Sequence, residues 1–459
     1  MKKYDLLVIG SGPAGQKGAI AAAKLGKSVA IVDRRNLLGG VSLHSGTIPS
    51  KTLREAILYL TGFRQRAFYG RDYTLKDKIT VADLKSRVST VVEREMSVIA
   101  SQLRRNSVEI LHGQARFVDA HTVRVESEEG IVDHTADKFL IACGTRPARG
   151  RDIEFDGKKV LVADQLGGIE ELPRELIVVG GGVVGLEYAS MFAALGIQVT
   201  VIDQRPEILD FADAEIIDSL VVQMREHGTT FRLGEKVISV GRDAKGDVLA
   251  RTESGKKIHG DALLYTVGRQ VNTDSLALDK VGIATDERGR IAVNAAYQTA
   301  VPHVYAAGDV IGFPSLASSS MEQGRIAATC MFDDTRCPII GLLPYGIYTI
   351  PEISMVGKNE KELTEAKIPF ESGVARFGEI AKGQMVGDTS GMLKLLFDPE
   401  SLKLLGVHVI GESATEIVHI GQAVIAFGGT IEYFRDSVFN YPTFAEAYKV
   451  AALNGINRL

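Results

Sequence analysis

The sequence predicts an α/β protein with two Rossmann-like domains and a C-terminal α+β domain. Three observations support this prediction. An apolar run, a glycine-rich turn and an alanine-rich helical stretch follow one another near the N-terminus, and the same order returns from Leu176. No third copy appears after Pro344. The 459 residues also exceed one hydrophobic core, because domains average roughly 150 residues.

The first copy is a βαβ unit with the fingerprint of a dinucleotide site. Tyr4 to Ile9 predicts a buried parallel strand, and the next strand ends in Asp33. Between them, Gly10 allows a tight turn, Gly12 lets a pyrophosphate approach the backbone, and Gly15 lets the helix pack on the strand. The helix N-terminus favours the phosphate, and Asp33 accepts ribose hydroxyls.

The second copy has its first strand at Leu176 to Val179 and its terminal acid at Asp203. Its glycines occupy the same three places: Gly180, Gly182 and Gly185. Two copies predict two dinucleotides, and hydride transfer between them follows because no other cofactor signal is present. Asp203 favours the free 2′-hydroxyl of NAD, whereas Arg205 suits the 2′-phosphate of NADP, so both nucleotides stay open.

The composition excludes several classes of protein. The chain has 53 basic and 57 acidic residues, a net charge of −4, which gives no general attraction for nucleic acid or an anionic membrane. Its apolar runs are too short for a signal peptide or a membrane span. Cys143, Cys330 and Cys337 are too few and too scattered for a disulfide framework, and no cluster suits a metal. We therefore expect a cytoplasmic protein without bound metal.

The remaining elements follow from periodicity. Val81 to Arg105 predicts a long amphipathic helix, and Lys256 to Thr266 predicts a strand that ends at a glycine turn. Val304 to Ala306 predicts a strand that delivers Asp309 close to the first nucleotide. The last quarter has strand-like runs, including Leu404 to Ile410, and no fingerprint, which indicates an assembly domain.

Four motifs together resemble a known family. They are the paired fingerprints, G-T-I-P-S-K at 46–51, A-C-G-T-R-P at 142–147 and Y-A-A-G-D-V at 305–310. The chain resembles the FAD-dependent pyridine nucleotide-disulfide oxidoreductases over nearly its whole length. The resemblance implies a glutathione reductase-like fold, FAD on the first fingerprint, NAD(P)H on the second, and a homodimer built by the C-terminal domain.

The same resemblance implies domain boundaries and site residues. The FAD-binding domain would span 1–150 and continue as a central part over 272–343, the NAD(P)-binding domain 151–271, and the dimerisation domain 344–459. FAD would contact Gly10, Gly12, Gly15, Asp33, Gly40, Lys51, Ala115, Gly308 and Asp309. NAD(P) would contact Gly180, Gly182, Gly185, Glu187, Asp203, Arg205 and Gly268. Lys51 and Glu187 would form a pair beside flavin N5, where the lysine favours negative charge on the ring and the glutamate holds the lysine.

The chain differs from the disulfide-reducing members of the family at the two redox cysteines and at the histidine that exchanges their proton. Ser42 and Thr47 stand where those members carry two cysteines, and Tyr441 stands where they carry a histidine, with Glu446 following. Hydroxyl groups form no disulfide and take up no electrons from a flavin. Disulfide reduction is therefore excluded, short of a route through Cys143, Cys330 or Cys337, none of which falls in a flavin-loop motif. His44, Tyr441 and Glu446 remain minor candidates for the site, and a lone loop histidine such as His44 is more often simply solvated.

Finer motifs include Y-G-I-Y-T-I-P-E-I-S at 345–354, H-I-G-Q-A at 419–423 and the stretches 308–328 and 439–459. They resemble the transhydrogenase branch of this family, which implies the exchange NADPH + NAD⁺ ⇌ NADP⁺ + NADH through FAD. Two alternatives remain open. One is an NAD(P)H dehydrogenase (diaphorase) that passes electrons from FAD to a quinone or another acceptor. The other is a flavin-bearing binding protein that has lost its redox relay.

Overall fold

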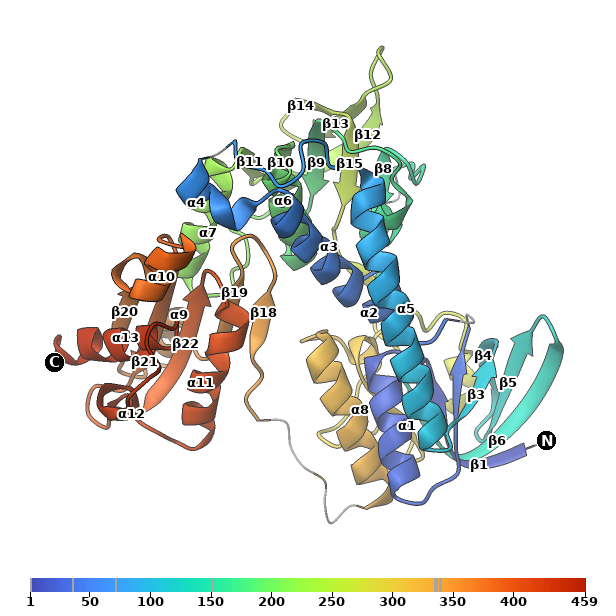
Figure 1. Cartoon of the computed structure of the whole chain (residues 1–459). Coiled ribbons are helices and arrows are strands. Elements are labelled where there is room, and N and C mark those ends of the chain that lie inside the picture. The colour runs from blue at the N-terminus through green and yellow to red at the C-terminus, as the bar shows by residue number, and fades with distance from the viewer. Residues whose placement is uncertain (1, 35–36, 71, 151, 334–336, 338–340) are drawn as a thin grey trace. The chain divides into compact units, whose positions relative to one another are not determined.

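The computed structural model describes residues 2–34, 37–70, 72–150, 152–333, 337 and 341–459 (Figure 1). The chain forms two compact units, and each unit is built from separate stretches of sequence. The first unit comprises Met1–Thr52, Lys85–Ala148 and Gly268–Ile340, and the second comprises Leu53–Leu84, Arg149–Val267 and Gly341–Leu459. No helix among the described residues is long and apolar enough to span a membrane.

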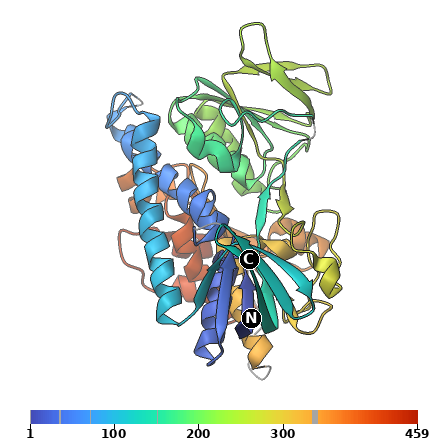
Figure 2. The same ribbon diagram turned by 90° about the vertical axis from the view of Figure 1, so that its right-hand side faces the viewer.

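The first unit is a sheet with helices packed on it. The strand order is β3-β2-β1-β6-β5-β4, and β17 pairs with β6. The parallel part consists of β1 (Lys2–Ile9), β2 (Val29–Asp33), β3 (Glu109–His112), β6 (Gly130–Ile141) and β17 (Val304–Ala306). The antiparallel strands β4 (Gln114–Asp119) and β5 (Thr122–Ser127) extend it. Figure 2 shows these strands fanning out around the N-terminus. Leu6, Leu7 and Val8 are fully buried, because a parallel sheet is covered on both faces.

Helices α1 (Pro13–Lys24) and α8 (Ala317–Phe332) lie side by side in the first unit (Figure 1). A Cβ at Gly324 of α8 would collide with the carbonyl oxygen of Ala14. A Cβ at Gly18 of α1 would collide with the side chain of Leu140. These two glycines therefore permit the close approach of the helices to each other and to the sheet. The long helix α5 (Val81–Arg105) has the bounds predicted from its periodicity.

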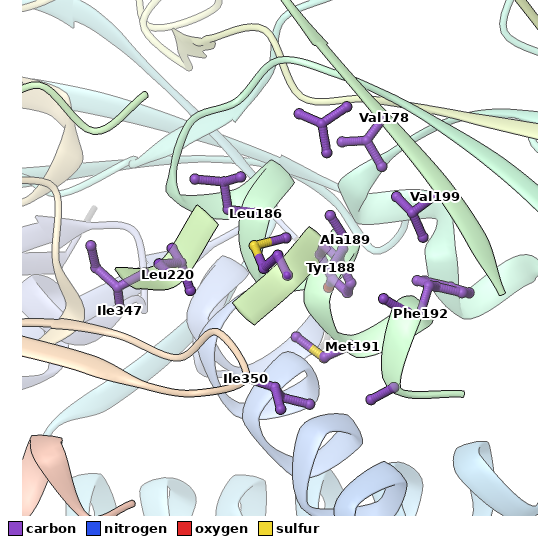
Figure 3. Packing of buried hydrophobic residues seen from close by; sticks show 14 of the residues in the cluster. Val178, Leu186, Tyr188, Ala189, Met191, Phe192, Val199, Leu220, Ile347 and Ile350 are labelled. Atoms are coloured by element: carbon purple, nitrogen blue, oxygen red, sulfur yellow. The ribbon is translucent and has the colours of Figure 1, made fainter. Parts of the chain in front are cut away.

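The second unit contains the other parallel sheet, with strand order β11-β10-β9-β15-β8. Its strands are β8 (Val160–Val162), β9 (Glu175–Val179), β10 (Gln198–Asp203), β11 (Thr229–Leu233) and β15 (Ala262–Tyr265). Its helices are α6 (Val183–Ala194) and α7 (Ala214–Glu226). Leu186, Ala189 and Met191 of α6 are fully buried in the apolar cluster of Figure 3. A helix that is apolar on all sides is expected to be buried in this way.

One sequence prediction for this unit is wrong. The stretch Lys256 to Thr266 is two strands, β14 (Lys257–Gly260) and β15. The chain changes sheet between them, since β14 pairs antiparallel with β13 (Val248–Thr252), next to β12 (Val237–Arg242), whereas β15 pairs parallel with β9. Asp261 marks the change, and its carboxylate accepts the backbone N–H of Arg174 at 2.7 Å.

The C-terminal part of the second unit is an antiparallel sheet of order β18-β19-β22-β21-β20. Its strands are β18 (Tyr345–Ile347), β19 (Ile353–Gly357), β20 (Glu371–Arg376), β21 (Met392–Phe397) and β22 (Leu404–Ile410). Helices α11 (Ala414–Ala426) and α13 (Glu446–Ile456) pack on it around a separate apolar cluster. The α+β character predicted for the last quarter of the chain is confirmed.

The cysteines differ from the expectation. Cys330, at the end of α8, and Cys337 form a disulfide. The sequence analysis did not predict it, because three cysteines were judged too few and too scattered for a disulfide framework. Cys143 is a free thiol. Burial raises the pKa of Cys143 to about 12, so it is protonated and unreactive at neutral pH.

Candidate dinucleotide and redox site

The first glycine turn, residues 10–15, joins β1 to α1 in the first unit. Gly10 has a φ of 108°, and a Cβ there would collide with the Ala142 carbonyl oxygen. A Cβ at Gly15 would collide with the carbonyl oxygen of Gly10. Gly12, in contrast, faces open space, with nothing within 4 Å of a Cβ built there. The turn is therefore tight where helix and strand meet and open in front of the helix N-terminus, where a pyrophosphate fits.

The acid at the end of β2 is tied to this turn by Ser11. The Oδ2 of Asp33 accepts the backbone N–H of Ser11 at 3.0 Å and also the Ser11 hydroxyl. The Ser11 hydroxyl in turn accepts the backbone N–H of Gly39 at 3.0 Å. Ser11 therefore links the first glycine turn to Asp33 and to the loop that begins at Gly39. The sequence analysis missed this role, although the position of Ser11 directly after the first glycine was the available signal.

The loop that follows forms a short helix, α2 (Gly40–His44), before α3 (Thr47–Leu60) begins. Gly40 has a φ of 61°, and its Cβ would lie 2.9 Å from Gly12 Cα, so the loop sits directly against the first glycine turn. The Ser42 hydroxyl donates to the Gly39 carbonyl at 3.2 Å. The Nε2 of His44 lies 2.8 Å from the Leu38 carbonyl oxygen, so the His44 ring connects two parts of the loop.

The segment that follows β17 (Val304–Ala306) approaches the same turn at Gly308. Gly308 has a φ of 83°, and a Cβ there would lie 3.1 Å from Ala14 Cβ. The Oδ2 of Asp309 accepts the Thr145 hydroxyl at 2.9 Å. The structure thus brings together the first glycine turn, Asp33, Gly40 and Gly308, and the neighbouring Asp309 carboxylate contacts Thr145. Ala115 lies in β4 in the apolar core of this unit, and Gly268 directly precedes β16 (Arg269–Val271) in the same unit.

The second glycine turn, residues 180–185, repeats this geometry in the second unit. Gly180 has a φ of 107°, and its Cβ would lie 2.8 Å from the Thr266 hydroxyl. A Cβ at Gly185 would collide with the Gly180 carbonyl oxygen, whereas Gly182 faces open space. At the end of β10, the Oδ2 of Asp203 accepts the backbone N–H of Gly181 at 2.6 Å. Burial acts in the opposite direction, but hydrogen bonds from Arg205 and Gly181 hold the pKa of Asp203 below its usual value.

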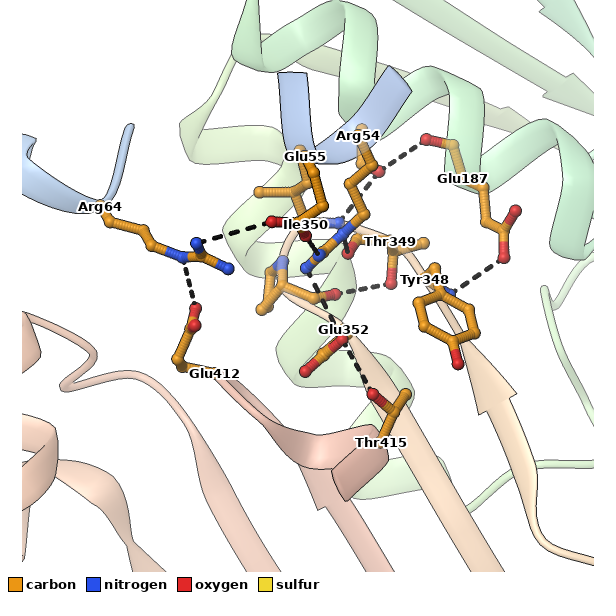
Figure 4. A network of polar contacts seen from close by, with 12 residues as sticks. Arg54, Glu55, Arg64, Glu187, Tyr348, Thr349, Ile350, Glu352, Glu412 and Thr415 are labelled. Carbon is orange, nitrogen blue, oxygen red and sulfur yellow. Dashed lines mark hydrogen bonds and ion pairs between the residues drawn. The ribbon is translucent and has the colours of Figure 1, made fainter. Parts of the chain in front are cut away.

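Glu187, on α6, belongs to a buried polar network in the second unit (Figure 4). Its Oε1 accepts the backbone N–H of Tyr348 at 3.0 Å. On the next turn of α6, the Ser190 hydroxyl donates to the Glu187 carbonyl at 2.9 Å and accepts the backbone N–H of Ile350 at 3.0 Å. Two residues of α6 thereby fix the backbone that follows β18.

Arg54 fixes the same backbone from α3. Its Nε donates to the Thr349 carbonyl at 3.0 Å, and its side chain is only 6% exposed. The Glu352 carboxylate lies 3.8 Å from its Nη2 and accepts the Thr415 hydroxyl at 3.2 Å. Lys51 lies on α3 one turn before Arg54, and its Nζ is 3.4 Å from the Ser50 hydroxyl. Lys51 falls in the first unit and Glu187 in the second, so their pairing stays a prediction.

We expect the Arg54→Met variant to lose about 2–3 kcal/mol of unfolding free energy at pH 7, because it leaves Glu352 buried without its cation. Burial already raises the pKa of Glu352 above 4.5 against the attraction of Arg54. Without Arg54 the pKa of Glu352 rises further, so the deficit in unfolding free energy relative to wild type should shrink as pH falls towards the raised pKa of wild-type Glu352, where the carboxyl is protonated in the variant. Urea unfolding of wild type and Arg54→Met at several pH values measures this difference in unfolding free energy.

Two variants control this prediction. Adding Glu352→Gln to Arg54→Met should recover most of the loss, because the buried charge is removed. Arg64→Met removes an arginine that is 42% exposed and pairs with Glu412, and we expect it to cost at most about 1 kcal/mol. Equal losses for Arg54→Met and Arg64→Met would contradict the argument from burial.

The other candidates from the C-terminus lie in the second unit. Tyr441 is 72% exposed, and Pro442, Thr443 and Ala445 beside it line an open cavity of about 560 Å³. The Oε2 of Glu446, on α13, is buried and has no hydrogen-bond partner among the described residues. Ser42 and Thr47 belong to the first unit, so the predicted relation between them and Tyr441 stays a prediction.

Comparison with known proteins adds the following. A family model described as pyridine nucleotide-disulphide oxidoreductase matches residues 4–324, and its dimerisation-domain model matches residues 343–452. A relative from Mycobacterium tuberculosis (strain ATCC 25177 / H37Ra), named soluble pyridine nucleotide transhydrogenase, is 53% identical, with 100% of this chain and 98% of the relative covered. A relative of the same name from Enterobacter sp. (strain 638) is 45% identical, with 99% and 98% covered.

Two solved structures are similar over nearly the full length. The crystal structure of LpdA from Mycobacterium tuberculosis matches with a TM-score of 0.90 at 26% identity, with 99% of both chains covered. The HOCl-induced flavoprotein disulfide reductase RclA from Escherichia coli matches with a TM-score of 0.88 at 26% identity, with 98% of this chain and 99% of that chain covered.

Proposed function

Because this chain belongs to the pyridine nucleotide-disulphide oxidoreductase family, we propose that it exchanges hydride between NADPH and NAD through FAD, as a soluble pyridine nucleotide transhydrogenase. The observation that carries this proposal is the full-length similarity to relatives of that name. The family, the glutathione reductase-like fold class and the transhydrogenase function predicted from the sequence are confirmed at that level. Serine and threonine at the redox-cysteine positions agree with it.

The first glycine turn has the shape that FAD needs. The open face at Gly12 and the N-terminus of α1 bind the pyrophosphate, while Asp33 holds the ribose and Asp309 approaches from β17. Gly40 lets the loop lie directly against the first glycine turn, because a side chain at this position would collide with Gly12. When bound, FAD accepts a hydride from one nicotinamide ring and returns it to another.

The second glycine turn binds the two nicotinamide dinucleotides in succession. Their pyrophosphate lies against the open face at Gly182, and their adenosine ribose lies towards Asp203. Glu187 and Lys51 act beside the flavin ring in this proposal, where the Lys51 ammonium favours negative charge and the buried Glu187 orients it. Thiol chemistry has no part in this proposal, since Cys143 is protonated and the Cys330–Cys337 disulfide lies outside the flavin-loop motif that contains Ser42 and Thr47.

The C-terminal part assembles the homodimer in this proposal. The family's dimerisation-domain model covers it, and its surface carries apolar side chains that a second copy would bury. Val438 is 94% exposed and Tyr441 72%, both next to the cavity of about 560 Å³.

Anaerobic spectroscopy of the purified holoenzyme tests the exchange. NADPH should bleach the flavin absorbance, and NAD⁺ added afterwards should restore it with release of NADH. Restoration by a quinone but not by NAD⁺ would support the NAD(P)H dehydrogenase instead. A flavin band that NADPH does not bleach would support the binding protein that has lost its relay.

Restoring the cysteines alone should not create a disulfide reductase. We expect the Ser42→Cys/Thr47→Cys variant to reduce a disulfide substrate poorly, because Tyr441 supplies no imidazole to exchange the thiol proton. Adding Tyr441→His should raise that activity about 100-fold, the usual contribution of a general acid–base group. NADPH-dependent thiol release measures both variants. Efficient reduction by the double variant would show that Tyr441 does not matter.

A further inference from the structure

Asp203 and Arg205 are two residues apart, and the structure pairs them. The Arg205 Nε donates to Asp203 Oδ1 at 3.1 Å, and its Nη2 donates to Oδ2 at 2.9 Å. The backbone N–H of Arg205 donates to Oδ1 at 2.8 Å, and that of Gly181 donates to Oδ2 at 2.6 Å. A carboxylate offers about four acceptor positions, so the chain itself fills those of Asp203.

This filled carboxylate bears on the two nucleotides differently. The acid at this place in a Rossmann unit accepts the ribose 2′-hydroxyl of NAD, but with Arg205 bound it has no acceptor left. A 2′-phosphate requires Arg205 to stay on Asp203, since the arginine neutralises the carboxylate that would otherwise repel the phosphate. The guanidinium has five donors and spends two on Asp203, which leaves three for phosphate oxygens.

Arg205 has a second carboxylate within reach. Its Nη1 lies 4.0 Å from Asp210 Oδ1. Arg205 is 43% exposed and Asp210 55% exposed, so the guanidinium can turn towards Asp210 at the surface. Because the move removes the cation from the buried Asp203, it requires a ribose hydroxyl to donate to that carboxylate in its place. Asp203 is 7% exposed and held by two backbone N–H groups, so it stays in place.

The corresponding turn of the first unit carries a hydroxyl next to its acid. There the residue after the first glycine is Ser11, whose hydroxyl donates to Asp33. In the second unit that residue is Gly181, where a Cβ would lie 2.8 Å from the Ile208 side chain and 3.3 Å from Asp203 Oδ2. A side chain has no room there, so no hydroxyl from this position competes with Arg205 for the Oδ2 of Asp203.

We propose that Arg205 adapts one site to both nucleotides: it stays on Asp203 when the ribose carries a 2′-phosphate, and moves to Asp210 when the ribose carries a free 2′-hydroxyl. This inference rests on the proposed function, because a transhydrogenase has to accept NADP and NAD at the same turn. Arg205 and Asp203 are then specificity-determining residues, and Asp210 is a positioning residue that acts through Arg205.

Calorimetric titration of the oxidised holoenzyme with ADP-ribose and 2′-phospho-ADP-ribose tests this proposal, since neither probe has a nicotinamide ring. Arg205→Ala should weaken 2′-phospho-ADP-ribose about tenfold or more and leave ADP-ribose unchanged or tighter. Asp210→Asn should weaken ADP-ribose about threefold and spare the phosphorylated probe, because Arg205 then stays on Asp203. Arg251→Ala removes an exposed arginine of β13 in the same unit and should change neither affinity.

The results separate this proposal from the proposed function. Equal weakening of both probes by Arg205→Ala, or no change in either, would overturn the role of Arg205. Unchanged ADP-ribose affinity in Asp210→Asn would overturn the move to Asp210. Failure of NAD⁺ to restore the flavin absorbance of the wild-type enzyme would overturn the proposed function, whatever the affinities of the variants.

Discussion

The Lys51→Met variant is expected to bleach its flavin band with NADPH about 100-fold more slowly than wild type. Lys51 follows the loop of Ser42 and Thr47 on α3, and one turn later the buried Arg54 fixes this helix to the Thr349 carbonyl. A fixed ammonium stabilises developing negative charge without reorganising, and removing one such group typically costs 10²–10³ in rate. Anaerobic stopped-flow absorbance measures the rate, and the flavin content of each variant shows whether binding is intact.

Two controls make this result specific. Lys51→Arg keeps the charge and should retain much of the rate. Lys24→Met removes an exposed lysine from the end of α1 in the same unit and should have no effect. A wild-type rate in Lys51→Met would reduce Lys51 to a surface lysine, and an equal loss in Lys24→Met would point to net charge.

The Lys394→Met variant is expected to lose about 3–5 kcal/mol of unfolding free energy, the usual cost of breaking a buried ion pair from one side. Lys394, on β21, is 2% exposed, and its Nζ lies 3.1 Å from Asp213, 2.9 Å from Glu360 and 3.2 Å from Glu215. The Asp213 side chain is 1% exposed, and its Oδ2 has no hydrogen-bond partner among the described residues. Without Lys394, this acid would be left buried beside two other carboxylates.

The pH dependence follows from the same contacts. Burial lowers the pKa of Lys394, but the attraction of Asp213 and Glu360 outweighs it and raises the pKa above 10.5. A lysine whose folded pKa is raised stabilises the fold fully below 10.5 and loses that contribution as pH rises through the folded value. The difference between wild type and Lys394→Met should therefore be constant near neutral pH and shrink only above pH 10.5.

Denaturant unfolding of three variants checks the argument. Lys394→Met/Asp213→Asn should recover part of the loss, because it removes the most buried carboxylate. Lys361→Met changes an exposed lysine on α9 (Glu360–Glu365), next to Glu360, and should cost less than about 1 kcal/mol. A small loss in Lys394→Met would mean that the carboxylates find other partners.

The sequence by itself determined the two glycine turns and the elements around them. Helix Val81–Arg105 and strands Val304–Ala306 and Leu404–Ile410 have the predicted bounds. Gly10 and Gly180 adopt a positive φ, and this requirement can be read locally because other residues rarely adopt it. Periodicity and turn chemistry act over a few residues, so the order of the chain is enough to reveal them.

Only the tertiary structure decided which polar groups meet. Arg54 reaches the Thr349 carbonyl across 295 positions, and Lys394 reaches Asp213 across 181. No local pattern encodes such pairs, because they depend on how separate elements pack. Even Asp203 and Arg205, two residues apart, remained ambiguous from sequence. Their side chains can point to each other or to a ligand, and only the fold, which buries Asp203 and leaves Arg205 at the surface, decides between them.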